Sequence, residues 1–88
     1  MYLHLGSDVV INTENIIAIY DLDTTTVSSI SRRYLANAQK VNLVTAISDE
    51  LPKSYIVTKS DTGIQIYLSN ISSVTLAKRA ESFKFLIN

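Results

Sequence analysis

Cysteine is absent from the sequence, so disulfide bonds, thiolate nucleophiles and cysteine-based zinc sites are excluded. Only two glycines and one proline occur, which excludes a collagenous, linker-like or low-complexity chain. No apolar run approaches the roughly 18 residues that a membrane-spanning helix needs, and the N-terminus lacks the basic and apolar segments of a signal peptide. We therefore expect a well-folded, soluble and cytoplasmic protein with no membrane segment.

Charged residues are also scarce. They make up 18% of the 88 residues, whereas 47% are hydrophobic, and a typical chain is about 25% charged. A domain of this size buries only a thin core and needs proportionally more polar covering than a larger one. We therefore expect a single domain over residues 1–88, part of whose apolar surface is covered by other copies in a homo-oligomer.

The net charge of zero hides an uneven distribution along the chain. Residues 1–30 contain four acidic residues and no lysine or arginine, whereas residues 31–88 contain all eight basic residues and four acidic ones. Such a chain can present one acidic and one basic surface. The basic surface could contact nucleic acid or the acidic surface of a neighbouring subunit, and the charge balance does not choose between them.

Alternating and β-branched segments predict several short strands. They lie within residues 2–20, at residues 43–47, and in a hairpin within residues 55–68. Strict alternation along the first segment would place Ile17 and Ile19 on the same face of a strand.

Two helices are expected where apolar residues recur at three- and four-residue steps. Residues 27–41 form such a stripe and predict a central amphipathic helix with basic residues on its opposite side. Ser72 and Ser73 can cap a C-terminal helix whose apolar stripe extends to Ile87. The segments together predict an α+β fold, in which a small antiparallel or mixed sheet is combined with one central amphipathic helix and a C-terminal helix.

No catalytic or metal-binding pattern in the sequence is specific. The single histidine, His4, could be combined with some serine and aspartate into a catalytic triad, but a structural or interface role explains it as well. Asp21 and Asp23 could bind a metal ion or cap the central helix, and the further oxygen ligands of a calcium loop are missing. Gly6 and Gly63 belong to no phosphate-binding loop and are typical of turns. We therefore expect no enzymatic activity, no metal and no cofactor.

Basic side chains are the remaining candidates for a functional site. Phosphate groups could be bound by a lysine in an exposed loop and by a basic pair on each helix, namely Lys53, Arg32, Arg33, Lys78 and Arg79. Basic residues on the solvent side of a helix are also common without any ligand, and the isoelectric point of about 6.5 is below that of typical nucleic-acid-binding domains. The two arginines of the central helix could equally face a neighbouring subunit.

Three segments taken together resemble the RemA/RemB family of extracellular-matrix regulatory proteins of Gram-positive bacteria. They are the opening MYLHLGSDVVINTENIIAIYDLD, the hairpin sequence PKSYIVT with IYLS, and the closing SSVTLAKRA. The resemblance implies a compact protomer related to the LytTR-type DNA-binding fold, assembly into ring-shaped homo-oligomers, and activation of biofilm-matrix genes through DNA binding. It also implies that RemA-type proteins have arginines at two places. This sequence has Asn15 at the first place, and at the second, the loop at residues 49–53, its one basic residue is Lys53.

Two hypotheses of different classes follow. In the first, a ring-shaped, DNA-binding transcriptional regulator contacts phosphates with few basic residues per protomer, because many weak contacts add by multivalency. In the second, the ring is a protein-interaction module that scaffolds or modulates a RemA-like partner without contacting DNA, through an acidic surface formed by Asp8, Glu14, Asp21 and Asp23. An enzyme would require a polar pocket that holds His4 beside a carboxylate and a serine. Ring size, target promoters and any regulatory ligand stay open.

Overall fold

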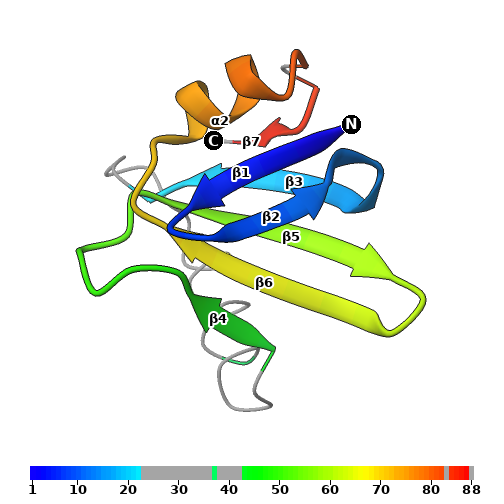
Figure 1. The fold of residues 1–88 in the computed structure, drawn as a ribbon, viewed down its shortest axis with the longest axis horizontal. Coiled ribbons are helices and arrows are strands. Elements are labelled where there is room, and N and C mark those ends of the chain that lie inside the picture. Colours follow the sequence, from blue (N-terminus) through cyan, green and yellow to red (C-terminus); the bar gives the residue numbers. More distant parts are fainter. Residues whose placement is uncertain (23–36, 38–42, 83, 88) are drawn as a thin grey trace.

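The computed structural model describes residues 1–22, 37, 43–82 and 84–87, and Figure 1 shows their arrangement. In this part of the chain the strands form a two-stranded sheet, β1-β2, and a five-stranded sheet with the order β4-β6-β5-β3-β7. The two-stranded sheet and the helix α2 lie on the same side of the larger sheet (Figure 1).

The two-stranded sheet is an antiparallel hairpin formed by β1 (Tyr2–Gly6) and β2 (Val9–Asn12). Its turn requires a left-handed backbone, with φ of 123° at Gly6 and 48° at Ser7. Side chains alternate between buried and exposed along β1, so the hairpin covers the core with one face and leaves the other exposed.

A single 3₁₀ turn, η1 (Thr13–Asn15), connects the hairpin to β3 (Ile16–Asp21). The strand β3 pairs antiparallel with β5 (Ser54–Ser60) and parallel with the short β7 (Leu86–Ile87). Because β7 has only two residues, it gives the sheet a short edge on this side.

The strands β5 and β6 (Gly63–Ser69) form the predicted central hairpin, which is paired from Ser54–Ser69 to Ser60–Gly63. Gly63 has φ of 112° in its turn. The strand β4 (Val44–Ala46) pairs parallel with β6 and closes the other edge of the sheet. The predicted strand at residues 43–47 is therefore confirmed in its centre.

The two faces of the larger sheet carry separate cores. Residues of the hairpin, of α2 and of the facing strands form the main core: Leu3, Leu5, Ile11, Ile16, Ile19, Ile56, Leu76 and Ala80. On the opposite face Tyr55, Val57 and Ile66 are buried, with Tyr20 stacked on Tyr55 at a ring-centroid distance of 4.4 Å. Aromatic stacking across paired strands stabilises the sheet beyond the area it buries.

The expected α+β fold with two helices is wrong. The described chain is mostly β, and its one α-helix is α2 (Ser73–Arg79). The C-terminal helix begins at Ser73 as predicted, but it does not reach Ile87. It ends at Arg79 because Glu81 adopts a left-handed backbone with φ of 56°, and the chain then returns to the sheet as β7. The predicted central helix at residues 27–41 falls almost entirely outside the described residues.

The expected alternation in β3 is also wrong. The register of β3 against β5 shifts between Ile16 and Ala18, which marks a bulge. As a result Ile16 and Ile19 both face the main core, whereas the side chain of Ile17 is 52% exposed. The bulge thus places the large apolar side chain of Ile17 on the surface. Strict alternation would have placed it on the same face as Ile19.

Candidate functional site

Lys53 lies directly before β5 on a backbone that is fixed from both sides. Its N–H donates to the carbonyl oxygen of Ser69 at 2.8 Å, and its carbonyl oxygen accepts from the N–H of Leu22 at 2.8 Å. The side chain is exposed. The predicted exposed lysine is therefore confirmed, and it extends from the end of the sheet on an ordered main chain.

The loop before Lys53 is held in place by its own polar contacts. The Nδ2 of Asn70 donates to Oε2 of Glu50 at 2.9 Å, and the N–H of Glu50 donates to Oγ of Ser48 at 3.0 Å. Between Glu50 and Lys53 the side chain of Leu51 is 86% exposed. The carboxylate of Glu50 in this loop thus accepts a hydrogen bond from the amide of Asn70. Within the described residues no carboxylate forms an ion pair with Lys53.

Lys78 and Arg79 are exposed in the last turn of α2. The helix begins at the N-cap Ser72, whose Oγ accepts from the N–H of Thr75 at 3.2 Å. Cations in a last turn also stabilise the helix through its dipole, so these two residues have a structural role without any ligand. Figure 1 shows the loop that precedes β5 at one side of the molecule and the end of α2 above the sheet, so these two segments are not side by side in this view.

Several predicted residues fall outside the described part of the chain. Arg32 and Arg33 are among them, and so is Asp23. Asp21 is the last residue of β3 and pairs with Ser54 in the sheet. The proposed capping role of the two aspartates therefore concerns a segment that the structure does not describe.

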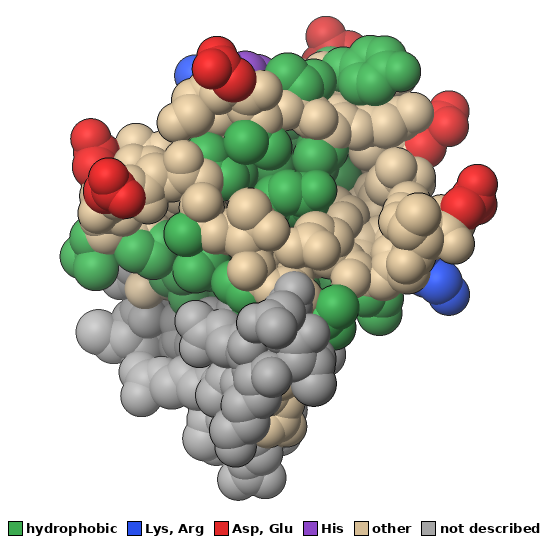
Figure 2. Space-filling view, turned by 60° about the horizontal axis from the view of Figure 1, so that its bottom comes forward, with side chains coloured by type: hydrophobic (Ala, Val, Ile, Leu, Met, Phe, Trp, Pro, Cys, Tyr) green, Lys and Arg blue, Asp and Glu red, His purple; other side chains and the backbone are tan. Residues whose placement is uncertain are grey.

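The acidic candidates that the structure does describe are distributed around the molecule. Asp8 is exposed beside the turn of the first hairpin, and Glu14 is exposed in η1. Figure 2 shows a face on which hydrophobic side chains gather in a central hollow, while charged side chains, mostly acidic, project from the outline. This face therefore combines apolar surface with negative charge.

His4 lies on the exposed face of β1. Its Nε2 donates to the carbonyl oxygen of Ser7 at 2.6 Å, which ties the strand to its turn. No carboxylate among the described residues is hydrogen-bonded to the ring. The contact gives His4 the structural role that was one of the two interpretations of this residue.

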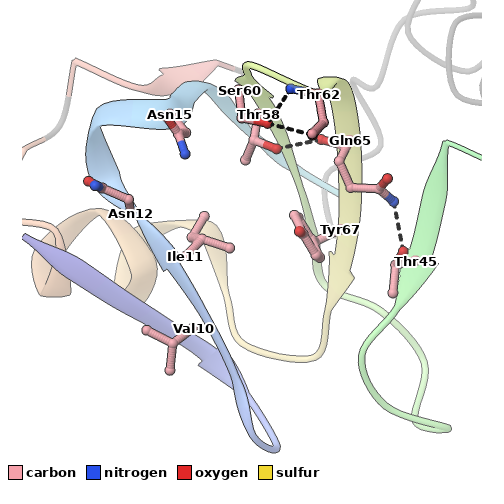
Figure 3. A pocket seen from close by; sticks show the side chains of 10 residues that line it. All are labelled: Val10, Ile11, Asn12, Asn15, Thr45, Thr58, Ser60, Thr62, Gln65 and Tyr67. Atoms are coloured by element: carbon pink, nitrogen blue, oxygen red, sulfur yellow. Dashed lines mark hydrogen bonds between the residues drawn. The ribbon is translucent and has the colours of Figure 1, made fainter.

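A cavity of about 550 Å³ opens between β2, η1 and the strands β4, β5 and β6. Figure 3 shows its side chains, which come from both sheets: Val10, Ile11, Asn12, Asn15, Thr45, Thr58, Ser60, Thr62, Gln65 and Tyr67. Asn15, the position at which the resemblance implies an arginine, is one of them. No pattern in the sequence predicts this site. One feature of the sequence does indicate a shared polar surface. Gln65 and Tyr67 alternate with the apolar residues of β6, and alternate residues of a strand lie on the same face.

Neither a metal centre nor a membrane helix is found in the described residues. No three side chains of histidine, aspartate or glutamate gather there in a way that could hold a metal ion. No helix among them is long and apolar enough to cross a membrane.

Comparison with known proteins relates the whole chain to one family. Residues 2–80 match the RemA-like family, described as extracellular matrix regulatory protein A-like. The chain is 40% identical over 88 residues to Extracellular matrix regulatory protein B of Bacillus subtilis (strain 168), and the alignment covers 100% of this chain and 99% of that protein. The collinear match extends over both hairpins and α2.

Proposed function

Because the chain belongs to the RemA-like family of extracellular matrix regulatory proteins, we propose that it regulates extracellular-matrix genes as a ring-shaped, DNA-binding homo-oligomer. We propose no enzymatic activity and no cofactor for it. The observation that carries the DNA-binding part is the exposed Lys53, which extends from a backbone hydrogen-bonded on both sides.

Lys53 would contact the phosphate backbone of a duplex. An ammonium group on a flexible stem contacts phosphate as a point charge and carries no base information, so the contact positions the protein and does not read sequence. Sequence preference would then come from the shape of the DNA and from the spacing of equivalent lysines around the oligomer. Arg32, Arg33, Lys78 and Arg79 remain further candidates for phosphate contacts in this proposal.

The oligomeric part of the proposal is supported by apolar side chains on the surface. Tyr2 is 72% exposed and lies on the outer face of the first hairpin. Ile17 on the bulge of β3 is a second exposed apolar side chain. In a domain with so few charged residues, apolar groups of this size are typical of surfaces that other subunits cover.

The proposal is tested by charge reversal at Lys53. We expect Lys53→Glu to abolish binding of an A/T-rich matrix-promoter duplex in fluorescence anisotropy at low salt, because each copy in the ring replaces an attraction by a repulsion. Lys59→Glu is the matched control, since Lys59 is also exposed but lies at the opposite end of β5. Equal loss in both variants, or unchanged binding by Lys53→Glu, would refute the assigned contact.

A second candidate function is that of an oligomeric interaction module for a RemA-like partner. Exposed acidic side chains such as Asp8 and Glu14, and the acidic outline in Figure 2, favour it. In that case Lys53→Glu leaves partner binding intact, whereas Asp8→Lys and Glu14→Lys weaken it. Pull-down of a purified RemA-like protein with these variants separates the two functions.

A further inference from the structure

We propose that the cavity between β2, η1 and the β5–β6 hairpin binds an uncharged, polyhydroxylated molecule of mono- or disaccharide size. Its volume of about 550 Å³ lies within the range of about 300–1,000 Å³ that is usual for small-molecule sites. The regular strands β5 and β6 form its floor, so the lining side chains start from a fixed backbone (Figure 3).

Among the described residues, the lining of the cavity contains no charged side chain. Eight of the ten described lining residues carry a hydroxyl or amide group, and the other two are Val10 and Ile11. A charged ligand would give up part of its hydration without meeting an opposite charge among these side chains. A purely apolar ligand would remove the hydroxyl and amide groups from water without replacing their hydrogen bonds. A neutral ligand with several hydroxyl groups avoids both costs.

Two polar groups in the cavity are free to bind such a ligand. The amide of Asn15 and the hydroxyl of Tyr67 form no hydrogen bond in the described structure, and both side chains are half-buried. Figure 3 shows Asn15 on the η1 side of the cavity and Tyr67 on its floor. An amide supplies both donors and acceptors, and a phenol supplies one of each, which suits hydroxyl groups that act in both ways.

Most of the remaining polar groups are held in position by hydrogen bonds to one another. The Nε2 of Gln65 donates to Oγ1 of Thr45 at 2.7 Å, and Oγ1 of Thr58 donates to the carbonyl oxygen of Gln65 at 2.8 Å. The hydroxyls of Ser60 and Thr62 are 2.9 Å apart. These contacts fix the side chains while leaving acceptor positions open, such as Oε1 of Gln65, so little ordering is needed when a ligand binds.

A nucleobase is a second kind of neutral ligand, but it is planar. The distribution of the polar groups favours a sugar over a nucleobase. A base offers hydrogen bonds along one edge and requires stacking, whereas here the polar groups stand on three sides: Asn15, Thr45, and the strand residues of β5 and β6. Tyr67 is the single aromatic side chain among the described residues of the lining. With Ile11 it gives a limited apolar surface, which suits the C–H groups of a sugar ring.

The test is saturation-transfer difference NMR on the intact oligomer, with glucose, sucrose and trehalose as probes. Glucose 6-phosphate and adenosine test the preference for uncharged and for non-aromatic ligands. We expect saturable binding of at least one of the three sugars in the millimolar to micromolar range, since a few hydrogen bonds and a small apolar contact support no more. Neither glucose 6-phosphate nor adenosine is expected to bind comparably.

Variants locate the site. Tyr67→Phe removes only one hydroxyl and is expected to weaken sugar binding about 3- to 10-fold, the value of one hydrogen bond. Tyr2→Phe makes the same change at an exposed tyrosine outside the cavity and is expected to leave binding unchanged. Asn15→Ala is paired in the same way with Asn70→Ala, whose amide binds Glu50 outside the cavity.

The proposal is overturned if no sugar binds, if adenosine or glucose 6-phosphate binds in preference, or if Tyr67→Phe and Tyr2→Phe affect binding equally. It is also overturned if Tyr67→Phe and Asn15→Ala change the oligomeric mass while sugars do not bind, because the cavity is then a subunit contact. The DNA-binding proposal is tested separately, since Lys53 does not line the cavity and Lys53→Glu should retain sugar binding.

Discussion

At the scale of single residues, Gly6 and Gly63 occupy equivalent turns with different surroundings. Both have a positive φ, of 123° and 112°, which side chains other than glycine rarely adopt. A Cβ on Gly6 would lie 3.2 Å from Oδ1 of Asn70, whereas one on Gly63 would meet no atom within 4 Å. The turn role of both residues could be predicted from the sequence, but the crowding at Gly6 depends on a contact between residues 64 positions apart.

We expect Gly63→Ala to lower the free energy of unfolding by about 1–2 kcal/mol through backbone strain. Gly6→Ala should cost about 1 kcal/mol more, because the added methyl group also displaces Asn70. Since 1 kcal/mol shifts the melting temperature of a domain this small by about 4–8 °C, thermal unfolding at equal protomer concentration resolves the difference. Equal melting temperatures for the two variants would contradict the assigned contact.

At the scale of elements, α2 ends in hydrogen bonds that the hydrophobic pattern does not reveal. The N–H of Glu81 donates to the carbonyl of Lys78 at 3.0 Å, and the N–H of Ser82 donates to that of Ala77 at 3.1 Å. This is the Schellman arrangement, which usually has glycine at the position of Glu81. The N-cap serine made the start of α2 predictable. Its end was not predictable, because glutamate stands at the position where glycine usually marks the end of a helix.

Replacing this glutamate should stabilise the protein. We expect Glu81→Gly to raise the free energy of unfolding by about 0.5–1 kcal/mol, because glycine adopts the left-handed backbone without a steric cost. Asp49→Gly, in an exposed loop position without positive φ, is the control and should be neutral or slightly destabilising. A lower melting temperature for Glu81→Gly would contradict this expectation. It would show that the glutamate side chain stabilises the fold by more than its left-handed backbone destabilises it.

The strands could be predicted where apolar and polar residues alternate without interruption along the sequence. The alternation of Ile64, Ile66 and Leu68 predicts the face of β6 correctly, because that strand pairs with β5 in an unbroken register. In β3 the bulge changes the periodicity by one residue and exposes Ile17. A bulge arises from the pairing of two strands, so the sequence of one strand does not reveal it.

At the scale of the whole molecule, the shortage of charge predicted surface that other copies cover. The exposed Tyr2 and Ile17 are consistent with that reasoning. The polar cavity could not be predicted in the same way, because it forms only where η1 and β2 lie against β5 and β6. Residues that are distant in sequence create it, and no spacing along the chain marks them as one site.

The exposed apolar residues allow a direct test of assembly. We expect Ile17→Glu to lower the mass of the particle in light scattering, because a charge in a subunit contact is costly to bury. Asp61→Lys, at an exposed position in the turn between β5 and β6 and outside the cavity, is the control and should retain the mass. An unchanged mass for Ile17→Glu would remove this side chain from the subunit contact.

The central claim is that the oligomer contacts many phosphates at once. The most direct measurement is the anisotropy of a labelled A/T-rich promoter duplex, titrated with the intact oligomer at several salt concentrations. For Z phosphate contacts log K should fall with log[salt] with a slope of about −0.9Z. We predict a steep slope for the natural protein, from several copies of Lys53 bound at once. Absence of binding at low salt, with the oligomer shown to be intact, would contradict the claim and leave the interaction module as the function.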